Sequence, residues 1–174
     1  IEISIKADDK TITYGDNAPT LSYIVTSGSV LAGDVFTGQL SYNGNGDAGT
    51  YNIVQNNLSL GKNYTINYTH GILRINKAQN IIEFSIESET TFSDGQTINL
   101  NAMASSGLPI EYSCSNTDIA TINNELLIIK SYGTITITAN QIGNNNYLSA
   151  ESVKAILKVN LLVNAIKKGD NMIL

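Results

Sequence analysis

The chain has 174 residues, a formal net charge of −5 and only ten Lys and Arg, which are scattered singly apart from Lys167 and Lys168. This pattern argues against a nucleic-acid partner, because binding to phosphates requires clustered basic side chains. Hydrophobic residues make up 42% and charged residues 14% of the chain. Disordered chains are rich in charge and poor in apolar residues, so we expect this chain to fold. No apolar run reaches the roughly 18 residues that a membrane-spanning helix requires, so we expect no membrane insertion of this segment.

The first half shows apolar residues at every second position, which is typical of half-buried β-strands. IEISIK at residues 1–6 places its three isoleucines on one face. The glycine-rich NGNGDAG at residues 43–49 predicts a turn between QLSY and TYNIV. Residues 64–76 alternate in two runs separated by His70 and Gly71, which predicts a hairpin. Residues 27–36, SGSVLAGDVF, are the single stretch that allows a helical turn.

The second half repeats this alternation in IIEFSI, INLNA, TITITA and VKAILKV, with turn formers such as SDGQ, SSGLP and IGNNN between the runs. Short strands separated by turns at intervals of roughly 8 to 12 residues predict an antiparallel sandwich or a related all-β fold. A polar joint at residues 77–80 separates two sets of strands. We therefore predict an all-β chain of two tandem small antiparallel β domains, 1–78 and 79–160, with 161–174 as a tail or the start of a further module. The first domain is predicted to be a sandwich or β-grasp-like.

The only cysteine and the only histidine are the first candidates for a catalytic pair. In IEYSCS at residues 110–115, Cys114 falls on the same strand face as Ile110 and Tyr112, so we expect it to point toward the core. His70 lies in the other predicted domain, beside a glycine, and is interpreted as a polar turn residue. Neither residue has the neighbours that a nucleophile or a metal ligand requires, and we predict no catalytic residues and no metal site.

Tyrosine is enriched, with nine Tyr and no Trp. Most tyrosines share the apolar face of their strand, but Tyr14, Tyr132 and Tyr147 lie near turns, so they are the candidate binding residues for glycans or a protein partner. We expect no cofactor. Structural calcium is an alternative, because six aspartates lie in loops rich in glycine and asparagine, although they lack EF-hand spacing and are also ordinary turn formers. These are Asp8, Asp9, Asp16, Asp34, Asp47 and Asp94.

The first half resembles the bacterial MBG domain of the YGX type. The resemblance is carried by Tyr14-Gly15, by residues 19–21 (PTL), Gly33-Asp34, residues 49–51 (GTY) and residues 63–66 (NYTI), which occur in the expected order. The second half, with LNAMASSGLPIEYSCSN and GTITITANQIGNNNYLSA, resembles bacterial Ig-like repeats, although Cys114 stands where such repeats usually carry serine.

The resemblance implies an Ig-like β-sandwich for the second domain and a bacterial extracellular location, on the cell surface or secreted. It also implies that the chain is part of a longer adhesin-like repeat protein. The leading hypothesis is a non-enzymatic spacer segment. The alternatives are a glycan- or mucin-binding adhesion module, with surface glycans or proteins of a host or another cell as partners, and an accessory region of a secreted enzyme.

Overall fold

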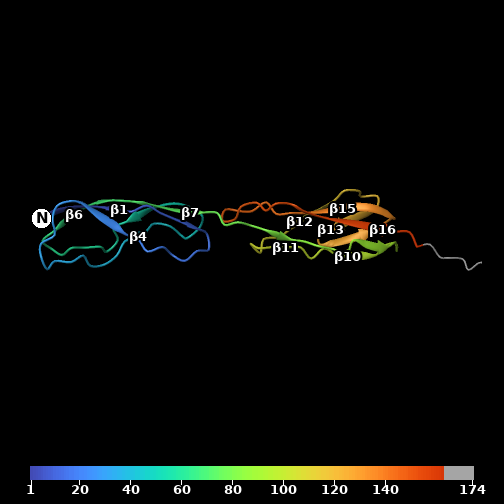
Figure 1. Ribbon diagram of the computed structural model, residues 1–174, viewed down its shortest axis with the longest axis horizontal. Coiled ribbons are helices and arrows are strands. Elements are labelled where there is room, and N and C mark those ends of the chain that lie inside the picture. The colour runs from blue at the N-terminus through green and yellow to red at the C-terminus, as the bar shows by residue number, and fades with distance from the viewer. Residues whose placement is uncertain (163–174) are drawn as a thin grey trace, which may run out of the picture. The chain divides into compact units, whose positions relative to one another are not determined.

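The computed structural model describes residues 1–162, and its regular elements are all β-strands (Figure 1). No helix occurs in these residues, which confirms the predicted all-β fold class. Within the same range, none of the chain forms a helix long and apolar enough to cross a membrane. Residues 163–174, most of the predicted tail or further module, lie outside the described part of the chain.

The chain divides into two compact units, and each is described by itself below. Unit 1 comprises Ile1–Gln79 together with Gly143–Leu148, a short segment that the predicted division places in the second domain. Unit 2 comprises Asn80–Ile142 and the residues from Ser149 onward. The predicted boundaries, 1–78 and 79–160, remain a prediction about independent domains.

Unit 1 is a sandwich of two sheets, with strand orders β3-β1-β6 and β2-β7-β5-β4. Both sheets contribute to a single core, in which Ile3 and Ile5 of β1 pack with Ile53 of β5 and Leu73 of β7. Residues 27–36 form no helix. A turn within them is closed by the Asp34 amide, which donates to the Leu31 carbonyl at 3.1 Å. Of the two predicted arrangements the unit therefore has the sandwich. Its strands are β1 Glu2–Ala7, β2 Lys10–Thr13, β3 Tyr23–Ser27, β4 Ser41–Tyr42, β5 Gly49–Val54, β6 Thr65–Thr69 and β7 Ile72–Asn76.

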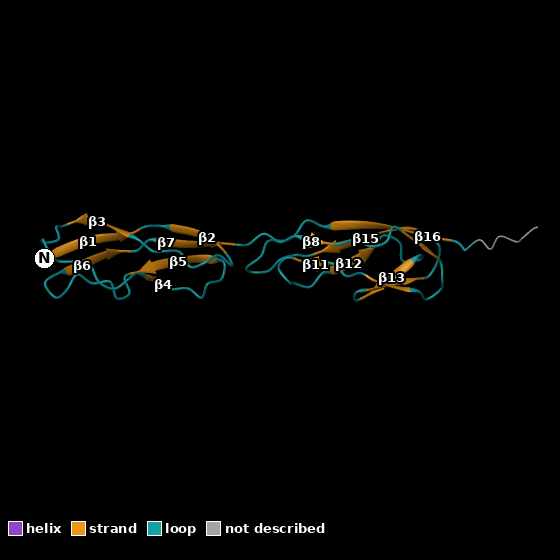
Figure 2. Cartoon of the chain, turned by 60° about the horizontal axis from the view of Figure 1, so that its bottom comes forward, coloured by secondary structure: helices purple, strands orange, loops and turns teal. Residues whose placement is uncertain are grey.

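Two strand pairs of unit 1, β1 with β6 and β2 with β7, run parallel. Together they form what we call the parallel ribbon, in which residues 2–13 lie beside residues 65–76 (Figure 2). Glu2 pairs with Thr65 and Thr13 pairs with Asn76, so residue n is paired with residue n + 63 throughout both strand pairs. The ribbon begins in one sheet, as β1 and β6, and continues in the other, as β2 and β7. The hairpin predicted for residues 64–76 is therefore wrong: β6 and β7 belong to different sheets and each pairs with an N-terminal strand.

The two strands of the ribbon change sheets at the same level. A Cβ atom at Gly71 would lie 2.6 Å from the Ala7 carbonyl oxygen and 2.9 Å from that of Asp8. Both distances are shorter than a Cβ atom can approach without a steric clash. On the other side of the crossing, the Ile72 amide donates to Asp9 Oδ1 at 2.7 Å. Glycine at position 71 is therefore required by the close approach of two backbones.

Unit 2 is also a sandwich, with strand orders β11-β8, β10-β14-β13 and β12-β15-β16-β9. Leu127 of β14 and Leu157 of β16, from different sheets, share one core. Most strand pairs are antiparallel as predicted, but β9 and β16 pair in parallel. The strands are β8 Ile82–Glu83, β9 Glu89–Thr91, β10 Thr97–Asn99, β11 Met103–Ala104, β12 Glu111–Cys114, β13 Ala120–Asn123, β14 Leu126–Ile129, β15 Gly133–Asn140 and β16 Val153–Asn160.

The crossing yields a first prediction. Replacing Gly71 by alanine is expected to destabilise unit 1 by about 1–3 kcal/mol, because the new methyl group meets backbone oxygens that cannot move without separating the ribbon. Equilibrium denaturation of the full chain measures the change. His70→Ala is the matched control, since His70 is exposed at the same crossing and its truncation should change stability by no more than about 0.5 kcal/mol. Equal stability of the two variants would contradict the argument.

Candidate functional site

Two of the three candidate tyrosines lie together in unit 1. Tyr14 directly follows β2, and Tyr147 lies in the segment 143–148, between β15 and β16 in the sequence. Their ring centroids are 5.4 Å apart at an interplanar angle of 77°, an edge-to-face contact. Both side chains are half-buried, and Tyr14 also packs against the core of unit 1. Such ring pairs contribute about 0.5–1.5 kcal/mol beyond the burial of their area.

Asn146 holds the same segment on unit 1 by hydrogen bonds to the loop between β4 and β5. Its Nδ2 donates to Asp47 Oδ1 at 2.8 Å, and its Oδ1 accepts from the Ala48 amide at 2.8 Å. Its backbone carbonyl accepts from the Ala78 amide at 2.9 Å. Sequence reasoning treated residues 142–146 only as a turn and did not identify Asn146. The signal in the sequence is the run of three asparagines before a tyrosine.

The segment is shaped locally before it makes these contacts. Asn144 Oδ1 accepts from the amides of Asn146 and Tyr147, at 2.8 and 2.9 Å, which is a side-chain-closed turn of the kind that asparagine favours. Gly143 has φ of +74°, and a Cβ atom there would lie 2.5 Å from the Tyr147 carbonyl oxygen. The Lys77 ammonium donates to the Asn144 carbonyl at 2.7 Å. Asn146 and Tyr147 are thus presented by a closed loop.

The receiving loop, residues 43–48, is held against the ring of Tyr51. A Cβ atom at Gly44 would lie 2.5 Å from that ring, so the backbone rests directly on the aromatic face. The Tyr51 hydroxyl lies 3.0 Å from Asn45 Oδ1 and 2.9 Å from the Asp47 carbonyl oxygen. The predicted turn between QLSY and TYNIV is confirmed, since β4 and β5 pair antiparallel on either side of it.

The third candidate, Tyr132, lies in unit 2 between β14 and β15, with 57% of its surface exposed. Tyr14 and Tyr147 contact each other, so their rings are engaged within unit 1. Tyr132 is the candidate whose ring is open to solvent. Whether any of the three binds a ligand stays a prediction.

The candidate cysteine lies on β12 as strand parity predicts. Tyr112 and Cys114 are half-buried and pack against the core of unit 2. The alternate residues of the strand, Glu111 and Ser113, are exposed. The Cys114 thiol lies 3.5 Å from the Asn116 carbonyl oxygen. His70 is exposed at the sheet crossing of unit 1. The parity prediction is confirmed, with the thiol half-buried and not fully enclosed.

Most of the loop aspartates accept hydrogen bonds that close turns or crossings. Asp16 Oδ2 accepts from the Thr13 amide at 2.8 Å, and Asp34 Oδ2 accepts from the Tyr64 hydroxyl at 2.6 Å. Asp8 accepts from the Ser22 hydroxyl at 2.6 Å. Within residues 1–162, no three side chains among His, Cys, Asp and Glu are grouped so that they could hold a metal ion.

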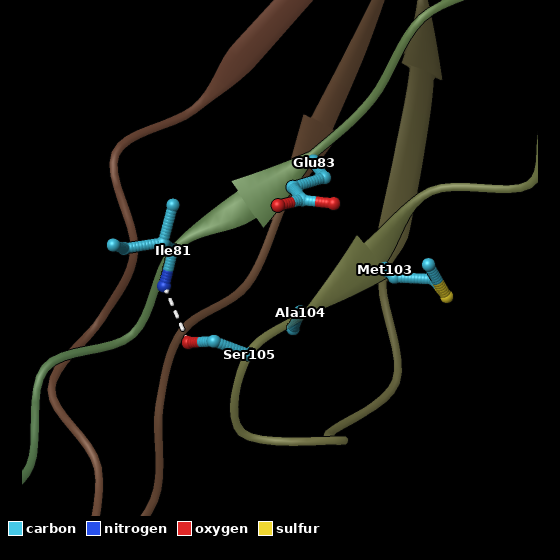
Figure 3. Close-up of a pocket in the computed structure, with 5 residues that line it drawn as sticks. All are labelled: Ile81, Glu83, Met103, Ala104 and Ser105. Atoms are coloured by element: carbon cyan, nitrogen blue, oxygen red, sulfur yellow. Dashed lines mark hydrogen bonds between the residues drawn. The ribbon is translucent and has the colours of Figure 1, made fainter.

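Unit 2 carries a small apolar hollow of about 290 Å³ beside β8 and β11 (Figure 3). Ile81 and Met103, 64% and 66% exposed, are apolar residues that line it, and Glu83 supplies a carboxylate. Ser105 Oγ accepts from the Ile81 amide at 3.0 Å and therefore ties the two strands together. The hollow lies at the lower limit of the volumes that hold small molecules.

The hydroxyl groups of four tyrosines have a raised pKa. Burial raises the pKa of Tyr23, Tyr68 and Tyr112. The hydrogen bond to Asp34 is the main cause that raises the pKa of Tyr64. The Tyr68 hydroxyl donates to the Ile53 carbonyl at 2.7 Å, and that of Tyr112 to the Leu100 carbonyl at 2.5 Å. The hydroxyls of Tyr64, Tyr68 and Tyr112 are thus neutral hydrogen-bond donors at ordinary pH.

Comparison with known proteins gives one domain match. Residues 3–74 match the family described as the MBG domain (YGX type), which lies within unit 1 and supports the resemblance seen in the first half. No curated protein matches the chain. Among solved structures, the crystal structure of Drosophila N-cadherin EC1-4 is similar at 12% identity with a TM-score of 0.44, over 92% of this chain. The chain spans 50% of the length of that cadherin chain. The resemblance of the second half to bacterial Ig-like repeats stays a prediction.

The docked segment gives a second prediction. Asn146→Ala is expected to destabilise unit 1 by about 1–3 kcal/mol, because it removes the partners of Asp47 Oδ1 and of the Ala48 amide. Denaturation of the full chain, followed by amide hydrogen exchange at Ala48 and Ala78, locates the loss. The adjacent Asn145→Ala is the matched control, since Asn145 is exposed. Similar effects of both changes would argue against the specific role of Asn146.

A third prediction concerns alkaline pH. A tyrosine whose pKa is raised on folding contributes stability that is complete below its unfolded pKa, about 10, and is lost as pH rises through the folded pKa. The denaturation midpoint should therefore fall as pH rises above about 10. Tyr68→Phe should make this fall shallower, because phenylalanine does not titrate. An unchanged pH profile in this variant would refute the assignment to Tyr68.

Proposed function

We propose that this chain is a non-enzymatic spacer segment of a bacterial cell-surface or secreted adhesin-like repeat protein. The match of residues 3–74 to the MBG domain supports this proposal, because the resemblance associates that domain with tandem arrays in large surface and secreted proteins.

The observation that carries the proposal is the direction of the parallel ribbon. Because its two strands run parallel, residue 2 and residue 76 lie at opposite ends of the ribbon. A strand rises by about 3.3 Å per residue, so twelve residues advance the chain by about 40 Å between its entry and its exit. In a unit with parallel terminal strands, the chain enters at one end and leaves at the other, so the unit adds its own length to the distance that the chain spans. This is the property that a spacer requires.

Unit 2, taken by itself, has a related arrangement. Its early strand β9 pairs in parallel with its last strand β16, with Glu89 beside Lys158. The Lys158 ammonium lies 3.6 Å from the Glu89 carboxylate, an exposed ion pair that contributes little, typically below about 1 kcal/mol. In this unit too, therefore, an early strand and the last strand run in the same direction.

A glycan- or mucin-binding module is the second candidate. The exposure of Tyr132 favours it, because an aromatic ring open to solvent on one face of a β-unit can stack on a sugar. In unit 1 the contact between Tyr14 and Tyr147 favours the spacer, since it uses their rings for packing.

Two experiments test the proposal. The isolated chain, applied to a glycan array and to mucin, is expected not to bind. Binding that is lost in Tyr132→Ala but retained in Ile156→Ala, a control at another exposed apolar side chain of unit 2, would favour the binding module and contradict the spacer. An antibody against the chain is expected to label intact producing cells or their medium, and label confined to lysed cells would contradict a surface or secreted location.

A further inference from the structure

The parallel ribbon extends beyond its assigned strands at both ends. The Thr65 amide donates to the Ile1 carbonyl at 2.8 Å, and the Tyr14 amide donates to the Asn76 carbonyl at 2.8 Å. The pairing thus runs from residue 1 to residue 14 on one strand and from residue 65 to residue 76 on the other, and it keeps one register on both sides of the crossing at residues 7–9 and 70–72. No other pair of neighbouring strands in unit 1 continues from one sheet into the other.

We propose that this ribbon is the element of unit 1 that resists tension applied along the chain. The inference rests on the proposed function in one respect, since a spacer between two attached points is pulled through its chain ends. Force that enters before residue 1 and leaves after residue 76 acts along the strand axis and in opposite directions on the two strands. Every hydrogen bond between them is then loaded together, whereas a pull at one end would break the bonds one after another.

The buried side chains of the ribbon add to this resistance. Ile3 and Ile5 on one strand and Leu73 on the other are fully enclosed in the core. A slip by one residue would turn these side chains to the opposite face of their sheets, and a slip by two would still displace each of them from its packing partners. Sliding therefore requires the core to open at the same time as the hydrogen bonds break.

The sheet crossing prevents the ribbon from yielding at its middle. Gly71 lies against the carbonyls of Ala7 and Asp8, and Asp9 accepts from the Ile72 amide at 2.7 Å. The two strands thus remain in contact where they leave one sheet for the other. A shear displacement meets resistance along the whole ribbon, including at the crossing.

Single-molecule pulling of the full chain in two geometries tests the inference. In the first, handles are attached at the N-terminus and at Gln79→Cys, which loads the ribbon along its axis. In the second, the handles are at the N-terminus and at Lys62→Cys, which lies just before β6, so that both forces act at one end of the ribbon. Gln79 and Lys62 are both exposed, and Cys114→Ser removes the native thiol in both proteins.

The unfolding force in the first geometry is expected to exceed that in the second by at least about twofold, because unfolding under force follows the barrier along the pulling direction. Equal forces, or a lower force in the first geometry, would overturn the inference. That result leaves the spacer proposal standing, because the tests of surface location and ligand binding do not depend on mechanical strength. Conversely, a strong ribbon in a chain that binds glycans through Tyr132 would refute the spacer alone.

Discussion

The architecture of unit 1 depends on the close passage of two backbones at Gly71. Each of the two terminal runs pairs within one sheet, changes sheet and pairs again, and both do so at the same level. Any side chain at position 71 would meet the carbonyls of Ala7 and Asp8. The absence of a Cβ atom there lets the register of n + 63 continue unchanged, and that register in turn decides which isoleucines and leucines enter the shared core.

Asparagine and aspartate perform a second task, which is to satisfy backbone amides where strands end. Asn144 closes its own loop, Asn146 reaches the Ala48 amide, and Asp9 reaches the Ile72 amide. A buried or half-buried amide without a partner is costly, so each of these short side chains replaces a strand neighbour that the loop lacks. The number of strand ends and crossings therefore gives the loops a structural use for Asn and Asp.

Much of the fold could be predicted from the alternation of apolar residues. Because a strand has a period of two and glycine marks its ends, three features could be predicted. They are the buried faces of residues 1–6 and 153–159, the inward position of Cys114 and the turn at residues 43–48. The hairpin at residues 64–76 failed for a physical reason. Periodicity specifies which face is buried but contains no information on the partner strand, so β6 and β7 look alike whether they pair with each other or with β1 and β2.

The candidate site was predictable only in part, for a related reason. Position near a turn made Tyr14 and Tyr147 candidate binding residues, which stays a prediction. It did not indicate that the two rings meet, because their contact joins residues far apart in the sequence. Asn146 was missed because asparagine in a turn has a sufficient local explanation. Its partners, Asp47 and Ala48, lie far from it in the sequence, and no local pattern connects them with Asn146.

The parallel direction of the terminal strands links the fold to the proposed role. Antiparallel terminal strands would return the chain to the end at which it entered, and a unit of that kind adds bulk but little length. In unit 1 the first and last strands share one direction, and in unit 2 β9 and β16 do the same. Parallel pairs are slightly less stable per residue than antiparallel ones. The parallel pairs join the first and last strands of unit 1 and an early strand to the last strand of unit 2, so they affect the path of the chain more than its stability.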